Sequence, residues 1–236
     1  MMNKKYELTS ESKTIGSTTV YRIKTLRDFV DIKAGVLGGW IEKESNLSHE
    51  GDCWVTGNAW VSGDAWVVGD AWVSGDAHVG GSARVSEDAQ VGGHARVGGH
   101  AHVGGSARVS EDAQVDEGAW VVGDAWVGGN ARVGGNARVN GHTRVSGDAW
   151  VGGNARVGGD ARVGGHARIC EGDYTSTVIN LILPQYSITV LSTGKLQIGR
   201  ELNSIEEWKT TTLEQAVEMG LKEENYELFM KYINMQ

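Results

Sequence analysis

Four histidines stand at matching places in a glycine-rich stretch and are the side chains best suited to acid–base chemistry. Each follows a valine by three residues: His94, His100, His142 and His166. An imidazole titrates close to neutral pH, so each is a candidate general base. Aspartates stand 18 residues before and after two of them: Asp76 and Asp112 for His94, and Asp124 and Asp160 for His142. Because no nucleophile or pocket is evident beside them, we expect these histidines to form ion pairs with the aspartates rather than to act as catalytic bases.

Carboxylates also recur every 18 residues near the start of this stretch, at Asp52, Asp70 and Asp88. If residues 18 apart stack, these groups lie about 5 Å from each other and repel by roughly 1 kcal/mol in water. They either splay into solvent or share a weakly held cation such as Ca²⁺. A calcium titration that leaves the melting temperature unchanged would remove the second alternative.

Tryptophans occupy four successive repeats and form a candidate interaction surface: Trp54, Trp60, Trp66 and Trp72. Exposed tryptophan beside arginine suits stacking on sugars or bases, or a subunit interface. The alternative is that these broad side chains shield the flat β surface and stack on one another. Residues 18 apart give three such ladders, each of which begins with tryptophan and ends with arginine.

A six-residue repeat positions all of these side chains. A valine or isoleucine stands at every sixth position from Val55 to Ile169, which makes twenty consecutive hexads of the form Ala-x-Val-x-Gly-x. Two small inward residues separated by one outward residue predict a very short strand. Glycine fills the fifth place sixteen times and glutamate four times, at Glu87, Glu111, Glu117 and Glu171. Glycine there predicts a tight corner, so the chain should wind into stacked coils.

The hexads resemble those of the hexapeptide-repeat superfamily, whose members form a left-handed parallel β-helix with three hexads in each 18-residue coil. The flanking segments Val20–Phe29, Gly38–Glu44, Leu196–Gly199 and Ile205–Trp208 resemble a group of uncharacterised bacterial and prophage proteins that are labelled as hexapeptide acyltransferases. We therefore expect an all-β solenoid, a left-handed parallel β-helix with a small N-terminal cap and a C-terminal α+β appendage. The expected domains are residues 1–50, 51–172 and 173–236.

The resemblance implies an acyl-CoA-dependent transferase, with acetyl-CoA as co-substrate bound along the outer wall between subunits of a homotrimer. In such enzymes a histidine acts as base, and a loop thrown out of the coils often positions it. No hexad here is interrupted, and residues 80–91 recur identically at 104–115, an offset that places the copy on another face. We therefore expect a non-catalytic rigid structural or interaction module that self-associates, in a phage or prophage setting. The acyltransferase, with one of the four histidines as base, is the alternative.

Composition narrows the remaining possibilities. A net charge of -8 disfavours nucleic-acid binding, and no apolar run is long enough for a membrane span. No signal sequence is evident, so a cytoplasmic location is expected, with no membrane partner. Cys53 and Cys170 are expected to remain free thiols, and no cofactor is expected for the module.

The flanking segments predict further elements. Residues 18–26 and 35–43 resemble strands that cap the first coil, and 174–183, 186–191 and 195–198 resemble later strands, with a hairpin corner at Thr193-Gly194. The capping box Ser204-Ile-Glu-Glu207 predicts a helix. A second helix should begin near Thr212 and run toward Gly220, and a third should cover about 223–234.

Overall fold

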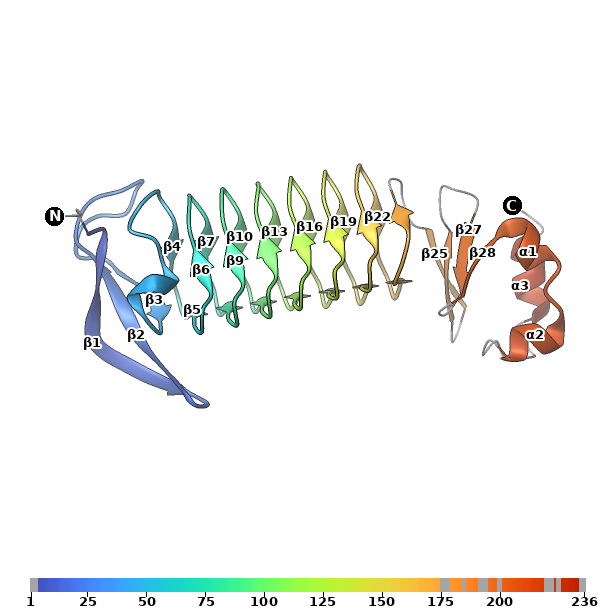
Figure 1. Ribbon diagram of the computed structural model, residues 1–236, viewed down its shortest axis with the longest axis horizontal. Helices are drawn as coiled ribbons and strands as arrows, with labels where there is room; N and C mark the ends of the chain where they lie inside the picture. Colours follow the sequence, from blue (N-terminus) through green and yellow to red (C-terminus); the bar gives the residue numbers. More distant parts are fainter. Residues whose placement is uncertain are drawn as a thin grey trace.

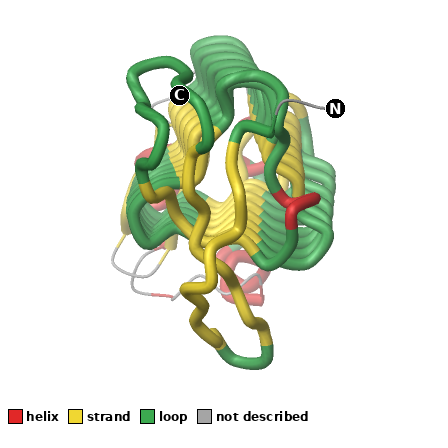
Figure 2. The backbone as a smooth tube through the Cα atoms, turned by 90° about the vertical axis from the view of Figure 1, so that its left-hand side faces the viewer, coloured by secondary structure: helices red, strands yellow, loops and turns green. Residues whose placement is uncertain are grey.

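The twenty hexads form twenty strands of two residues each, β4 to β23, which wind into a parallel β-solenoid as the hexads predict. The structure is a computed structural model that describes residues 4–174, 179–183, 186–190, 195–198, 201–218, 223 and 226–233. Each strand holds the outward residue and the valine of one hexad and pairs in parallel with the strand 18 residues away, for example Gln90 with Arg108. Figure 1 shows the resulting rod, and Figure 2 shows its coils superposed along the axis. The predicted fold class is therefore confirmed.

The strands form three flat faces. Face 1 is the row β4 (Trp54–Val55), β7 (Trp72–Val73), β10 (Gln90–Val91), β13 (Arg108–Val109), β16 (Trp126–Val127), β19 (Arg144–Val145) and β22 (Arg162–Val163). Face 2 is the row β5 (Trp60–Val61), β8 (His78–Val79), β11 (Arg96–Val97), β14 (Gln114–Val115), β17 (Arg132–Val133), β20 (Trp150–Val151) and β23 (Arg168–Ile169). Face 3 is the row β6 (Trp66–Val67), β9 (Arg84–Val85), β12 (His102–Val103), β15 (Trp120–Val121), β18 (Arg138–Val139), β21 (Arg156–Val157) and β24 (Asp173–Tyr174).

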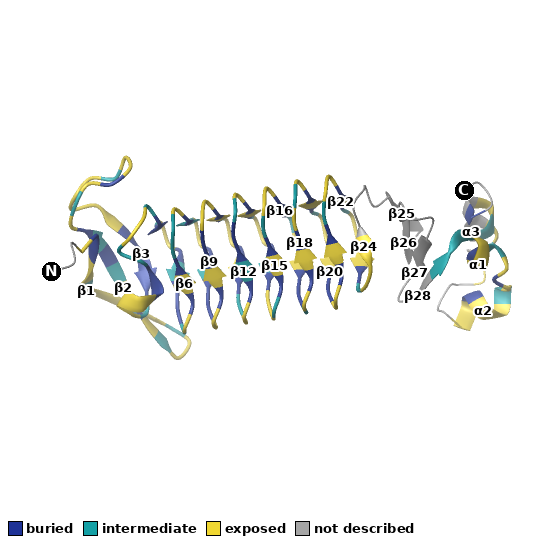
Figure 3. Cartoon of the chain, turned by 45° about the horizontal axis from the view of Figure 1, so that its top comes forward, coloured by how far each residue is buried: buried dark blue, intermediate teal, exposed yellow. Residues whose placement is uncertain are grey.

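The core of the solenoid is made of the alanine and valine columns. These side chains are at most 1% exposed along the hexads, whereas the residue between them is exposed or half-buried in every hexad except that of Trp54 (Figure 3). Burying one valine contributes about 1.5 kcal/mol, which is no more than the cost of ordering one or two backbone residues. Stability therefore depends on the stacking of many coils. Thr143 fits an alanine column because its hydroxyl donates to the carbonyl of Asn140 at 2.6 Å.

The corners need a left-handed backbone, and three glutamates adopt it. Glu87, Glu111 and Glu117 have φ of 61°, 61° and 56°, in the region that favours glycine. The carboxylate of each accepts a hydrogen bond from a glycine amide one coil further along. This bond offsets part of the backbone cost. At the fourth position the left-handed residue is Gly172 instead of Glu171.

The N-terminal segment continues face 2 and covers the first coil. It contains β1 (Tyr6–Ile15), β2 (Thr18–Thr25), β3 (Leu37–Ile41) and the short 3₁₀ helix η1 (Glu44–Asn46). β1 and β2 form an antiparallel hairpin, and β3 pairs in parallel with β5. The strand β1 was not predicted from the sequence, whereas β2 and β3 lie within the predicted ranges.

In the part of the C-terminal segment that the structure describes, four antiparallel strands precede three helices. The strands are β25 (Ile179–Leu183), β26 (Tyr186–Val190), β27 (Lys195–Ile198) and β28 (Glu201–Ser204), and the helices are α1 (Ile205–Lys209), α2 (Leu213–Glu218) and α3 (Tyr226–Ile233). The capping box is confirmed, since the Ser204 hydroxyl accepts from the Glu207 amide. Of the predicted strand 174–183, β25 confirms residues 179–183, Tyr174 belongs to β24 on face 3, and residues 175–178 lie outside the described residues. The strand β28 was not predicted. Thr193-Gly194 lies outside the described residues, and the three-domain division stays a prediction.

Candidate functional site

Three of the four candidate histidines each lie beside an aspartate carboxylate at the corners. The Nδ1 atoms of His142 and His166 lie 3.3 Å from carboxylate oxygens of Asp124 and Asp148, and that of His94 lies 3.7 Å from Asp76. These three imidazoles are 62–71% exposed. His100 is also exposed and makes no ion pair within the described chain. The structure therefore places the four candidates apart from one another, on convex corners.

The acidic column lies along one edge of the solenoid, and the weak cation site expected there stays a prediction. The amide of Asp52 donates to the Asp70 carboxylate at 2.9 Å, and Asp88 is exposed one coil further along. Across the described residues, no three His, Cys, Asp or Glu side chains gather closely enough to hold a metal ion. Asp52, Asp70 and Asp88 are stacked as expected, and the carboxylate of Asp70 accepts a backbone hydrogen bond.

The aromatic side chains on the faces stack on their neighbours in the ladder. The rings of Trp60 and His78 lie 3.5 Å apart and nearly parallel, and those of His102 and Trp120 lie 4.8 Å apart. The guanidinium of Arg84 lies 5.0 Å from the ring of Trp66. Each contact joins residues 18 apart. Mutual stacking along the rod, one of the two alternatives for the tryptophans, is thus present.

Trp54 is not part of the interaction surface, which corrects the prediction from the sequence. Its side chain is 1% exposed, because Tyr6 and Phe29 of the N-terminal segment pack edge-on against it at 6.2 and 5.3 Å between ring centroids. Trp60 and Trp72 are half-buried, and Trp66 is 41% exposed. The surface therefore starts one rung later on face 1 than on faces 2 and 3.

Two histidines on the faces are held neutral. Burial and the nearby Arg96 lower the pKa of His78 to about 4, and burial followed by Arg84 lowers the pKa of His102. Each ring also contacts a serine of the preceding coil at 3.2 Å, Ser62 for the first and Ser86 for the second. Neither ring is therefore charged at neutral pH.

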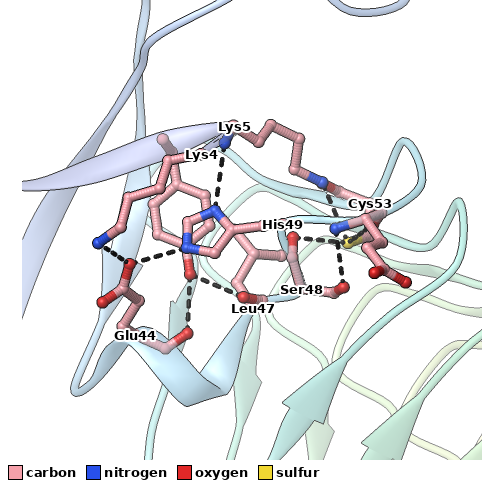
Figure 4. Close-up of polar contacts among 9 residues, drawn as sticks. Lys4, Lys5, Glu44, Leu47, Ser48, His49 and Cys53 are labelled. Carbon is pink, nitrogen blue, oxygen red and sulfur yellow. Dashed lines mark hydrogen bonds and ion pairs between the residues drawn. The ribbon is translucent and has the colours of Figure 1, made fainter. Parts of the chain in front are cut away.

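A buried polar cluster beneath the first coil was not anticipated from the sequence. The ammonium of Lys5, which is fully buried, donates to the carbonyls of Cys53 and Gly51 at 2.8 and 3.1 Å and to the Cys53 sulfur at 3.3 Å (Figure 4). Burial raises the pKa of the Cys53 thiol and lowers the pKa of Lys5. All three donors of Lys5 are used, so this contact closes the end of the core.

A histidine beside this cluster is fully occupied as well. The Nε2 atom of His49 lies 2.8 Å from the Glu44 carboxylate, while its Nδ1 accepts from the Lys5 amide at 3.2 Å (Figure 4). Its ring stacks on Tyr6 at 4.3 Å between centroids. Because both nitrogens are engaged, His49 orients the N-terminal segment and has no free lone pair for a substrate.

Among the described residues, hollows on the outside of the solenoid include two of a few hundred Å³. One, of about 790 Å³, lies beside η1 and is lined by Lys43, Glu44, Ser45, Leu47, Ser48, His49, Glu50, Asp64 and Trp66. The other, of about 460 Å³, lies on face 1 and is lined by Ser106, Arg108, Asp124, Trp126 and Arg144. Of the four candidate histidines, none lines either hollow. The second hollow presents one indole between two guanidinium groups.

Comparison with known proteins agrees with this architecture. Residues 131–147 match the family model described as the YdcK β-solenoid repeat. The strand pairing shows that the chain folds as a β-solenoid of six-residue repeats. The chain is also 33% identical over 60 residues to the protein named "Uncharacterized acetyltransferase YdcK" of Escherichia coli (strain K12), a match that covers 22% of this chain and 18% of that protein.

A solved structure from Bacillus cereus, described as a candidate acetyltransferase, is similar at 13% identity with a TM-score of 0.25. The likeness covers 83% of this chain and 96% of that chain. A TM-score of this size adds nothing to what the strand pairing shows. Among the described helices, none has the length and apolar character that crossing a membrane requires.

Proposed function

We propose that this protein is a non-catalytic, rigid interaction module. The observation that carries the proposal is the unbroken register of β4 to β23, which holds outward Trp, Arg, His and Gln side chains at a fixed spacing of about 4.8 Å along each face. Such a rod keeps the relative positions of its surface groups without any ordering on binding. It therefore suits the display of a fixed pattern to a partner.

The arrangement of the candidate bases supports the same proposal. A general base has to reach its substrate within hydrogen-bond distance in a site that restricts water. His94, His142 and His166 instead stand on convex corners, each beside a single aspartate. The polar cluster of Lys5, Cys53 and His49 uses its donors and acceptors internally.

The partner is best sought among proteins. The net charge of -8 gives nucleic acid and anionic membranes little to bind overall, and the repeated faces suit contact with further copies of the chain. We place the module in the cytoplasm and, from the resemblance of its flanking segments, in a phage or prophage setting.

Thiol release from acetyl-CoA tests the proposal against the acetyltransferase that the name of the E. coli relative suggests. The purified protein is incubated with acetyl-CoA and a panel of amine and hydroxyl acceptors, alongside His94→Ala, His100→Ala, His142→Ala and His166→Ala. We expect release at the rate of the protein-free blank for every sample. Turnover by the wild type that one of the four variants abolishes would overturn the proposal.

A further inference from the structure

Charge is segregated along the rod. Residues 44–128 contain thirteen acidic residues and three arginines, whereas residues 129–170 contain six arginines and two aspartates. The acidic half lies next to the N-terminal cap, and the basic half lies toward the C-terminal segment (Figure 1). The acidic half of one molecule is therefore complementary in charge to the basic half of a second molecule that lies alongside it in the reverse direction.

The arginines of the basic half are available for such a contact. Their side chains are exposed, and within the described chain none of them forms a salt bridge: Arg132, Arg138, Arg144, Arg156, Arg162 and Arg168. Arg144 and Arg162 lie on adjacent rungs of face 1. Like charges at this spacing repel by about 1 kcal/mol in water. An opposite charge or an aromatic face brought by a partner would relieve that repulsion.

The order of residues on face 1 is complementary to its own reverse. Above the buried Trp54, the outward side chains run Trp72, Gln90, Arg108, Trp126, Arg144 and Arg162. A two-fold axis between Arg108 and Trp126 would place the first rung on the sixth, the second on the fifth and the third on the fourth. Each tryptophan then meets an arginine, and the glutamine meets the remaining arginine.

From this order we infer that a second copy of the chain docks antiparallel on face 1. A two-fold contact of this kind is isologous, so both ends of the interface are satisfied at once. Trp72 lies opposite Arg162 of the second copy, Arg108 opposite its Trp126, and Gln90 opposite its Arg144. The inference rests on the proposed function, because it names the partner of the interaction module.

Two further features of face 1 fit this docking. The corners beside its acidic half hold Asp70, Asp76 and Asp88, which come to flank Arg144 and Arg162 of the other copy. The hollow of about 460 Å³ on face 1 adjoins the two-fold axis and is lined in part by Asp124 and Trp126, a carboxylate and an indole that Arg108 of the second copy would meet. Figure 1 shows the row β7 to β22 running between the N-terminal cap and the C-terminal segment, which lie at the two ends of the rod.

A parallel arrangement of copies, as in a trimer with its three-fold axis along the rod, has the opposite consequence. In that arrangement each rung lies level with the same rung of the neighbouring molecule. Arg144 would therefore lie beside Arg144 of the neighbour, and Arg162 beside Arg162 of the neighbour. The acidic halves would likewise meet each other. The charge pattern therefore favours the antiparallel pair over the parallel trimer that the resemblance implies.

Sedimentation equilibrium of the full-length wild type, at about 50 mM and about 500 mM NaCl, is the first test. We expect a reversible dimer whose dissociation constant rises at least tenfold at the higher salt, because exposed charges are screened over a shorter distance. A monomer at all concentrations up to about 200 µM, or a trimer, would overturn the inference. The proposed function is tested by thiol release, which is a separate readout. Failure of the dimer inference can therefore be distinguished from failure of the proposed function.

Charge exchange on face 1 is the decisive test. Arg144→Glu with Arg162→Glu, and separately Asp88→Lys with Gln90→Lys, should each weaken the dimer at least tenfold, since each places like charges opposite one another. An equimolar mixture of the two should dimerise again, because the exchanged charges then meet. Failure of the mixture to recover would contradict the antiparallel register.

The matched control carries the same exchange on face 2, as Arg132→Glu with Arg168→Glu. These positions are also exposed but lie on another face, so the control should keep the wild-type dissociation constant at low salt. Thermal melts of all variants show whether the coils remain intact. If the face 2 control weakens the dimer as much as the face 1 variant does, face 1 is not the interface.

Discussion

The tryptophan beneath the N-terminal segment should be a main anchor of that segment. Trp54 is 1% exposed and packs against Tyr6 and Phe29, so Trp54→Ala removes a fully buried indole. Large-to-small substitutions of this kind cost about 3–5 kcal/mol. Because a solenoid opens locally, the loss should fall on the segment that covers the first coil and not on the distant coils.

Hydrogen exchange measured by mass spectrometry reports this loss segment by segment. A loss of about 4 kcal/mol corresponds to roughly thousandfold faster exchange of amides in β1 to β3, if they exchange through opening of the segment. Peptides from β14 to β20 should be unchanged. The control is Trp120→Ala, whose side chain is 47% exposed and stacks on His102. Equal effects of the two variants on β1 to β3 would refute the reasoning.

Three further outcomes follow from single side chains. Glu111 holds a left-handed backbone with φ 61°, and its carboxylate accepts a hydrogen bond. Glu111→Ala keeps that backbone but loses the hydrogen bond, so the free energy of unfolding should fall by about 1 kcal/mol, whereas Glu111→Gly should stay within about 1 kcal/mol of the wild type. Urea unfolding that finds the alanine variant more stable than the glycine variant would contradict this. His78 has its pKa lowered to about 4 by burial and Arg96, so the unfolded chain takes up a proton first. Its stability contribution is therefore present above pH 6.5 and lost as the pH falls toward 4, and His78→Gln should melt with a shallower dependence over that window. Cys170 should react quickly with a thiol reagent and Cys53, which is buried with a raised pKa, only on unfolding; fast reaction of both would count against the buried cluster.

The sequence predicts the solenoid well because one short period sets both strand and corner. Residues 18 apart pair as the hexads require, so the three outward ladders follow from counting alone. The left-handed backbone of three glutamates could also have been predicted from the sequence. Glu87, Glu111 and Glu117 occupy the place of corner glycines, and the backbone of that place carries over to them. Glu171 departs because the hexads end there and Gly172 takes the turn.

The candidate site was less predictable, because its features depend on segments that the period does not describe. Trp54 has the same hexad place as the exposed Trp66, and only the packing of Tyr6 and Phe29 separates them. The contact between Lys5 and Cys53 joins residues 48 apart across that boundary. One signal was present: Cys53 is the first residue of an alanine column, where the end of the core has to be closed.

Calorimetric titration of the purified protein with acetyl-CoA tests the central claim most directly. The exposed corner histidines and the internally bonded polar cluster predict no saturable heat up to about millimolar ligand. Saturable binding in the micromolar range would contradict the account of a non-catalytic interaction module and would direct mutagenesis to His94, His100, His142 and His166.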